Sequence, residues 1–268
     1  MKKEQKQKKL AISLEPPPRK RTRPEEIYPL QLSLPGFEET GFTPNDYVRS
    51  ALFSVVRRGR RRYLEEVVIA AWKGVRIEYT GKQLDQADLD VLMAVARMAA
   101  DSETGIVHTS RRALLRAVGK QWGGQGWAWL RSSLIRMTAC DLAIYRGGYE
   151  YHGSILHWAK EESSDHLVII LNRYQRWLWD PRNLTAIDLA ARKALKSDLA
   201  KWMQGYVCSH AKDAEHKIGL EKLYPLTGST AKMFEFRRKL RQAMETLERL
   251  GIVKEWSLEK DILKFRRT

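Results

Sequence analysis

Apolar residues recur at helical spacing in three segments of the first half of the chain. Asp85 is suited to cap a helix through about Ala100, and Ser110 is suited to cap a shorter helix that ends at Gly119. A longer helix is expected from about Gln125 to Thr138, because one of its sides is apolar, formed by Trp127, Leu130, Leu134 and Met137.

Shorter apolar runs around these helices predict β-strands. Lys73-Gly74 and Arg146-Gly147-Gly148 each separate two such runs, which predicts two β-hairpins. Ile106–His108 and Leu167–Leu171 are expected to be two further strands. The first half of the chain therefore predicts a domain of mixed helices and strands.

The second half repeats this order. After a connecting helix, we expect a helix, a short strand, a short helix broken at Pro225, a turn, a long helix ended by Gly251, and a hairpin. The expected ranges are 172–179, 197–209, 216–219, 220–224, 227–230, 230–250, and 252–256 with 262–265. This succession is typical of a winged helix-turn-helix, in which the second of two angled helices enters the major groove of DNA.

The predicted fold class is therefore α+β, with two tandem winged-helix domains over residues 47–171 and 172–268. Folded structure is expected to begin near Tyr47. Residues 1–46 lack apolar periodicity, begin with a lysine-rich run and contain Pro16-Pro17-Pro18. This composition predicts a flexible basic N-terminal tail.

The charge of the chain favours a polyanionic partner. Lys and Arg outnumber Asp and Glu by 48 to 32, for a net charge of +16, and basic side chains that neutralise phosphates release condensed counterions. Cys140 and Cys208 alone do not suggest a disulfide framework, so a reduced, cytoplasmic protein is expected. No apolar run is long enough to span a membrane.

We call residues 47–171 the first block and residues 172–268 the second block. The long helix of the second block carries the main candidate site. Its apolar side is formed by Met233, Phe236, Leu240, Ala243, Leu247 and Leu250 and is expected in the core. Opposite that side lies Arg238, near Gln242; these side chains suit guanine and adenine edges and are predicted to contact bases. Phosphate contacts are predicted for Lys232, Arg237, Arg241 and Lys254, and Thr230 and Phe234 complete the DNA-binding set. The alternative interpretation is an ordinary solvated helix face.

In the first block, Arg131, Ser132 and Arg136 face outward from, or border, the apolar side of the long helix. Arg146, at the tip of the second hairpin, is predicted to lie along phosphate as part of a basic wing. The alternative is a solvated helix in a domain used for dimerisation.

Motifs for catalysis fail in this chain. Gly81-Lys82 is followed by Gln83 where a phosphate loop has Ser or Thr to hold magnesium. Cys208-Ser209-His210 lacks a second cysteine pair, which argues against zinc. We therefore expect no enzymatic activity, no metal and no cofactor.

With these motifs placed, the chain resembles the TrfA-type replication initiators of broad-host-range plasmids over most of its length from about residue 30, less well over 146–166. The segments that carry the resemblance are Arg49–Phe53, Gly74–Gly81, Leu84–Asp90, Ser197–His210, Ser229-Thr230, Phe236-Arg237 and Gly251–Val253. The resemblance implies that two winged-helix domains bind directly repeated iterons in double-stranded origin DNA and help to open it, with single-stranded origin DNA as a further candidate ligand. It also implies recruitment of the host initiator and the replicative helicase, and a poorly active homodimer.

One short segment with apolar residues interrupts the polar N-terminal tail. Gln31, Leu32, Ser33, Leu34 and Pro35 look like the short motif that docks on the bacterial sliding clamp, with an amide for hydrogen bonding and two leucines for apolar pockets. Packing of the same leucines onto the first domain is the alternative.

Two other classes of function stay open. A winged-helix transcriptional repressor would bind palindromic operators and would not need a clamp-binding tail. A nuclease or relaxase acting at an origin would cut DNA in the presence of a metal ion.

Overall fold

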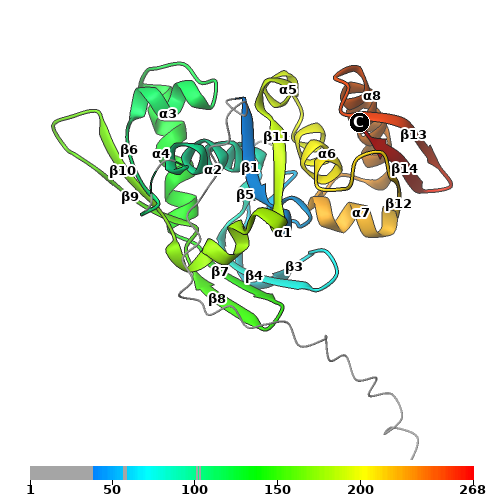
Figure 1. The fold of residues 1–268 in the computed structure, drawn as a ribbon, viewed down its shortest axis with the longest axis horizontal. Coiled ribbons are helices and arrows are strands. Elements are labelled where there is room, and N and C mark those ends of the chain that lie inside the picture. The colour runs from blue at the N-terminus through cyan, green and yellow to red at the C-terminus, as the bar shows by residue number, and fades with distance from the viewer. Residues whose placement is uncertain (1–38, 57–58, 101, 103) are drawn as a thin grey trace, which may run out of the picture.

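A computed structural model of the chain describes residues 39–56, 59–100, 102 and 104–268. Helices and strands alternate along the chain, and the strands form five small sheets (Figure 1). The expected mixture of helices and strands is thus confirmed. The clamp-like motif at 31–35 lies outside the described residues.

The described chain starts with a strand that the sequence did not indicate. Thr40–Pro44 (β1) pairs antiparallel with Leu184–Asp188 (β11), and a short helix, Asn45–Val48 (α1), follows it. Placing the start of folded structure near Tyr47 was therefore wrong. β1 has one large apolar residue, Phe42, and its partner strand lies some 140 residues further along, so neither strand carries a local signal.

A four-stranded sheet contains both predicted hairpins of the first block. Tyr63–Ile69 (β3) and Val75–Lys82 (β4) form the first hairpin, and Asp141–Arg146 (β7) and Tyr149–Gly153 (β8) form the second. β4 and β7 pair antiparallel and join the hairpins into the order β3-β4-β7-β8. Phe53–Ser54 (β2) and Leu84–Asp85 (β5) pair in parallel nearby.

The three predicted helices of the first block are confirmed. They are Gln86–Ala99 (α2), Arg111–Ala117 (α3) and Gly124–Thr138 (α4). Asp85 accepts hydrogen bonds from the backbone N–H of Ala87 and Asp88, and Ser110 accepts one from Ala113. These short polar side chains satisfy N–H groups that the first turn leaves without a helical partner.

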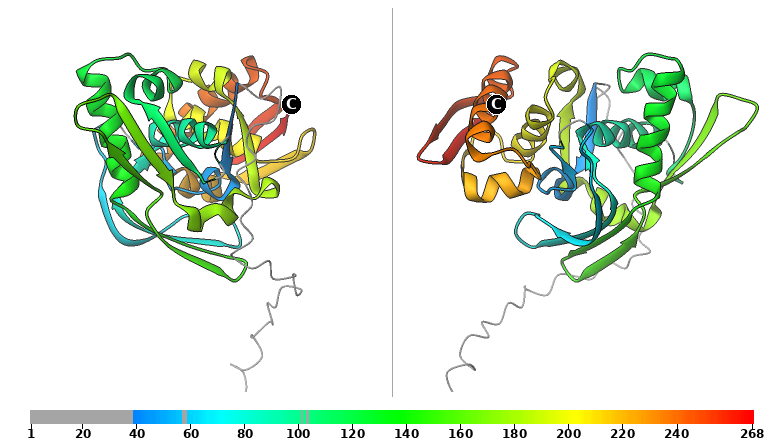
Figure 2. Two further views of the ribbon diagram at one scale, coloured as in Figure 1. Left: turned by 60° about the vertical axis from the view of Figure 1, so that its left-hand side comes forward. Right: turned by 180° about the vertical axis from the view of Figure 1, so that it is seen from behind.

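The strand before α3 does not share a sheet with the hairpin at Arg146, which was predicted to form the wing. Ile106–Ser110 (β6) pairs with His166–Leu171 (β10), which pairs with Leu156–Lys160 (β9). The Arg146 turn belongs to the four-stranded sheet instead. Placing a basic wing at that turn was therefore wrong, since β9 and β10 extend from the α2–α4 block at a separate position (Figures 1 and 2).

Two 3₁₀ segments, Arg173–Trp179 (η1) and Pro181–Asn183 (η2), and a short helix, Leu189–Ala194 (α5), connect to the second block. Its helices are Asp198–Cys208 (α6), Leu220–Thr227 (α7) and Met233–Arg249 (α8). Its sheet has the order β12-β14-β13, from Glu215–Gly219, Ile262–Arg267 and Val253–Glu259. The predicted order of elements is confirmed from α6 onward, whereas β11 and α5, which precede α6, were not predicted.

Two boundaries in the second block differ from those expected. α7 continues through Pro225 to Thr227, and Gly228 ends it in the left-handed conformation, with φ +63°. α8 begins at Met233 rather than Thr230, because Ser229–Lys232 form a loop. Tyr224 Oη holds that loop by donating to the carbonyl of Ala231 at 2.8 Å.

The buried apolar side chains form two clusters. The first extends along the chain from Tyr47 to Ile187 and the second from Leu195 to Phe265. The blocks meet through specific contacts: Val55 and Trp72 of the first block pack against the second cluster, and Trp202 Nε1 donates to the carbonyl of Ser50 at 3.2 Å. The domain limits at 171 and 172 stay a prediction.

Candidate nucleic-acid interface

The helix α8 has one buried side and two polar sides. Phe236, Leu240, Ala243, Met244 and Leu247 are buried against the second core cluster, as the spacing predicted for four of them. Leu250, which was also expected in the core, follows the helix and is exposed. Because this apolar side is buried, the polar side chains of α8 must face away from the second core cluster.

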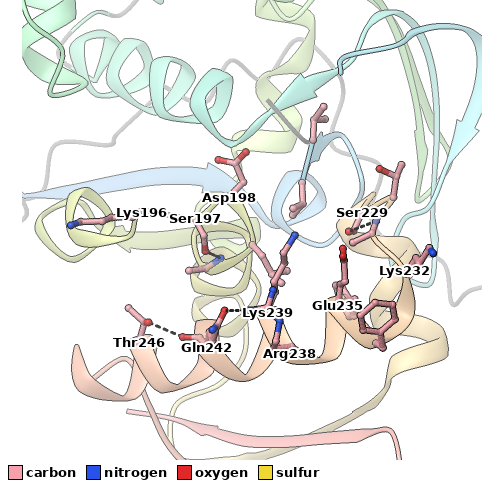
Figure 3. A pocket seen from close by; sticks show the side chains of 18 of the residues that line it. Lys196, Ser197, Asp198, Ser229, Lys232, Glu235, Arg238, Lys239, Gln242 and Thr246 are labelled. Atoms are coloured by element: carbon pink, nitrogen blue, oxygen red, sulfur yellow. Dashed lines mark hydrogen bonds between the residues drawn. The ribbon is translucent and has the colours of Figure 1, made fainter. Parts of the chain in front are cut away.

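One polar side of α8 lines a groove of about 1200 Å³. Its lining also includes the start of α6, as Figure 3 shows for Lys196, Ser197 and Asp198, and Val55, Val56 and Arg60 of the connection between β2 and β3. Five of the predicted DNA-binding residues line this groove: Thr230, Lys232, Phe234, Arg238 and Gln242. The structure thus brings together residues that the sequence grouped only by helical spacing.

Within this groove, Arg238 Nη1 lies 3.5 Å from Gln242 Oε1, one helical turn further on (Figure 3). Both side chains are exposed, and so is the ring of Phe234 at the start of the helix, at 64%. A guanidinium and an amide on one exposed face of a helix have the donors and acceptors that base edges in the major groove require.

The other polar side of α8 faces the β13–β14 hairpin. Arg237 forms an ion pair with Asp261 in the hairpin turn, and Lys254 on β13 forms one with Asp213, at 2.8 Å. The Arg237 guanidinium lowers the pKa of the Asp261 carboxyl by hydrogen bonding. Arg241 is exposed on α8. These three cations lie outside the groove.

The lining of the groove is predominantly basic. Six cationic side chains line it: Arg60, Lys196, Lys232, Arg238, Lys239 and Arg249. The two acidic ones are Asp198 and Glu235. Burial, and secondly the charge of Asp85, raise the pKa of Asp198 to about 6. Asp198 therefore loses its negative charge at a higher pH than a solvated aspartate does. The groove therefore attracts anions.

The candidate residues of the first block divide into two groups. Arg131 and Ser132 are exposed on α4, as predicted. Arg136 instead points toward α2, where its Nη2 donates to Asp88 Oδ1 at 2.6 Å, and Arg146 pairs with Asp46 at 2.8 Å. The sequence placed Arg136 at the edge of the apolar stripe but gave no sign of this buried partner. Arg136 is consequently a structural contact between two helices.

A cluster of arginine, lysine and tryptophan side chains around the α3–α4 connection was missed. The Arg112 guanidinium lies 5.0 Å from the ring centre of Trp122, and Lys120 Nζ lies 5.1 Å from that of Trp129. Arg111 lies over Trp122 and Trp127 as well. The available signal was three tryptophans within residues 122–129, shortly after the pair Arg111-Arg112, because such rings attract cations.

Within the described part of the chain, no group of His, Cys, Asp and Glu side chains is arranged to hold a metal ion. Among the same residues, no helix has both the length and the apolar character that a membrane crossing requires.

The groove has the charge of an anion-binding surface, and comparison with known proteins identifies the family. The family model of Replication protein C (RepC) matches residues 67–263, so the chain belongs to the replication protein C family. The prediction of a replication initiator is confirmed at this level. No curated protein sequence matches the chain significantly.

Solved structures of other chains share the fold. A crystal structure of selenomethionine derivatives of domains 2 and 3 of RctB superposes with a TM-score of 0.56, at 13% identity, over 84% of this chain and 98% of that chain. A second crystal structure of RctB domains 2–3 gives 0.50, at 12% identity, over 80% and 95%. The similarity extends over both blocks, so the arrangement of small sheets and helices is a fold that other chains adopt.

Proposed function

We propose that the chain is a plasmid replication initiator that binds directly repeated sequences in origin DNA through two winged-helix units. Family membership supports the role in replication. The order of elements supports the two winged-helix units. The unit in the second block consists of α6, β12, α7, α8 and the β13–β14 hairpin. The unit in the first block consists of α2, β6, α3, α4 and the β9–β10 hairpin.

The observation that carries the proposal is the position of Arg238 and Gln242 on the exposed, groove-lining side of α8. In a winged helix-turn-helix, the second helix of the motif enters the major groove, and α8 occupies that place after α7. Arg238 then contacts a guanine and Gln242 an adenine, while Thr230 and Lys232 in the loop before the helix contact phosphate.

The first unit contributes α4, with Arg131 and Ser132 exposed on it. Its wing is the β9–β10 hairpin, whose turn contains Glu161, Glu162 and Asp165. An acidic turn is unsuited to lie along phosphate, so this unit contacts DNA through α4 and not through its wing.

Further elements of the proposal concern partners. We expect the chain to recruit the host initiator and the replicative helicase, to bind the sliding clamp through Gln31–Pro35, and to be less active as a homodimer. We also expect no catalytic activity; a metal-dependent nicking assay on origin DNA that shows cleavage would contradict this part.

The test of DNA binding is a titration of origin DNA at several salt concentrations. With about 6 to 10 phosphate contacts, the affinity is expected to fall roughly 10³- to 10⁵-fold between 50 and 200 mM salt. Arg238→Ala is expected to cost about 1–3 kcal/mol at a single base pair and to reduce the ratio of specific to nonspecific affinity. A nearly flat salt dependence would exclude nucleic-acid binding of this kind.

A matched control is Arg182→Ala, which removes an exposed arginine of η2 that pairs with Asp180 and does not line the groove. This variant should bind both specific and nonspecific DNA as the unaltered chain does. Footprints on the replicon that encodes the protein should show direct repeats. A single palindromic footprint would favour a transcriptional repressor instead.

A further inference from the structure

An arginine of the first block reaches the groove that α8 lines. The connection between β2 and β3 has the sequence Arg57-Arg58-Gly59-Arg60-Arg61-Arg62, of which residues 57 and 58 lie outside the described residues. Arg60 is exposed and lines the same groove as Arg238. Among the described residues, the structure shows no hydrogen bond or ion pair made by the Arg60 side chain.

The chain before Arg60 is fixed to the second block. The backbone N–H of Val55 donates to the carbonyl of Thr227, at the end of α7, with a distance of 2.7 Å. The next residue, Gly228, packs so closely on Ser54 that a Cβ added to it would lie 2.4 Å from Ser54 Cβ. This contact is adjacent to the Ser229–Lys232 loop that leads into α8.

The chain after Arg60 is fixed to the first block. Arg61 Nη1 donates to Asp88 Oδ2 at 2.8 Å and to the carbonyl of Gln83 at 2.9 Å. The backbone N–H of Arg62 donates to Gln83 Oε1 at 3.0 Å. Residues on both sides of Arg60 are therefore held, one side by each block, and the position of Arg60 relative to α8 depends on the contact between the blocks.

The charge of the groove identifies the kind of ligand. Arg60 comes from the connection between β2 and β3, Lys196 from the residues before α6, and Lys232, Arg238, Lys239 and Arg249 from α8 and its preceding loop. Cations from three separate segments around one groove suit a phosphate backbone that passes through it. The guanidinium fork of Arg60 matches the oxygens of one phosphate group in a two-point contact.

We propose that Arg60 contacts the phosphate backbone of the same DNA duplex whose major groove α8 enters, so that the second DNA-binding surface is built by both blocks. This inference rests on the proposed DNA binding by α8 and adds to it a contact from the first block. The phosphate contact restricts the angle and register at which α8 meets the bases.

The test is a titration of specific and nonspecific duplexes with the full chain carrying Arg60→Ala. Loss of one phosphate contact should weaken both affinities by about five- to tenfold at 0.1 M salt and reduce the slope of log affinity against log salt by about one. The ratio of specific to nonspecific affinity should stay the same. Arg60→Lys should keep most of the slope, because the charge remains.

Arg62→Ala is the matched control, since Arg62 is a nearby exposed arginine that lines a smaller, separate pocket. It should leave affinity and slope unchanged. Equal losses in Arg60→Ala and Arg62→Ala would show that only the general charge of the segment matters and would overturn the inference. An unchanged melting temperature for Arg60→Ala, expected for an exposed side chain, establishes that the variant is folded.

Failure of this inference is distinguishable from failure of the proposed function. If Arg238→Ala reduces specificity while Arg60→Ala changes neither affinity nor salt slope, α8 binds DNA and the contact from the first block is absent. If the unaltered chain shows no salt-dependent binding, the proposed function itself fails.

Discussion

Arg237 on α8 and Asp261 in the β13–β14 turn form a two-point ion pair, with Nε 2.7 Å from Oδ1 and Nη2 2.6 Å from Oδ2. The pair connects the proposed recognition helix to the hairpin beside it. Arg237 was predicted to contact phosphate, yet its guanidinium group is already paired with the carboxylate of Asp261. The pair is exposed, so we expect a phosphate group of bound DNA to compete with Asp261 for the same guanidinium.

Removing that competitor should strengthen DNA binding. Asp261→Ala leaves Arg237 available for phosphate, so nonspecific affinity should rise and the salt dependence should steepen by about one counterion. Glu259→Ala, a charge removed from the same hairpin, is the control and should have a smaller effect. The measurement is a titration of nonspecific duplex at several salt concentrations. Weaker binding by Asp261→Ala would mean that the pair is needed to hold the hairpin in place for DNA.

The local signals in the sequence predicted the local structure well. Asp85, Ser110 and Ser197 each accept hydrogen bonds from the first turn of the helix that they were expected to begin, and Gly251 has a φ of +67° after α8. A cap or a left-handed glycine depends only on its neighbours along the chain, which is why such positions are recognisable without a structure.

What the sequence could not supply was the pairing of distant segments. β1 and β11 lie far apart in the chain, and the hairpins β7–β8 and β9–β10 are alike in length and pattern, so nothing local decides which of them pairs with β6. The same limit applies to the candidate site. Helical spacing placed Arg238 on the exposed side of α8, but the partner of Arg136 is a buried carboxylate, Asp88, 48 residues away in the chain.

That buried carboxylate should be essential for stability. Asp88 is fully buried on α2 and accepts hydrogen bonds from Arg61, Arg136 and the hydroxyl of Ser133. Asp88→Ala removes the carboxylate that pairs with Arg136 and one of the two carboxylates that pair with Arg61, so the free energy of unfolding should fall by about 3–5 kcal/mol. Denaturant unfolding measures this change.

Asp180→Ala is the control for that measurement, because Asp180 pairs with the exposed Arg182 at the surface. It should lower the free energy of unfolding by about 1 kcal/mol or less. A loss of similar size in Asp88→Ala would show that the two arginines find other partners or reach solvent.

The packing of His210, whose ring centre lies 6.3 Å from that of Trp72 in the first block, should be sensitive to acid. Burial, and secondly the neighbouring His216, lower the pKa of His210 to about 3, while its Nδ1 donates to the carbonyl of Tyr206 at 2.7 Å. Arg49 and Arg267 are the other cations near the ring. The unfolded chain takes up a proton on His210 as the pH falls below about 6.5, whereas the folded chain does so only near 3. Stability contributed by neutral His210 is therefore present above pH 6.5 and lost progressively as the pH falls toward 3.

His210→Asn keeps an N–H donor for Tyr206 and removes the titration, so the melting temperature should fall less between pH 7 and pH 4.5 than it does in the unaltered chain. His152→Asn is the control: His152 is exposed on β8 beside Glu150, and its removal should leave the pH profile as it was. Parallel profiles for the unaltered chain and His210→Asn would assign the acid sensitivity to other groups.

The N-terminal motif separates an initiator from a repressor most clearly. Gln31-Leu32-Ser33-Leu34-Pro35 lies in a polar, proline-containing stretch outside the described residues. A peptide covering residues 28–40 is expected to bind the bacterial sliding clamp in the micromolar range, about −8 kcal/mol. Replacing Gln31 and Leu34 together by Ala removes the amide and one apolar side chain, and should abolish clamp binding by the peptide and by the full chain.

Binding of duplex DNA should survive the same double substitution, because neither residue belongs to α4 or α8. Titrating the unaltered and doubly substituted chains against clamp and against origin DNA measures both properties on one pair of proteins. Equal clamp affinity for the two chains would remove the motif from the proposed function. A comparable loss of DNA affinity in the variant would show instead that the leucines pack on the fold, since a docking peptide outside the DNA-binding surfaces has no means of weakening both interactions together.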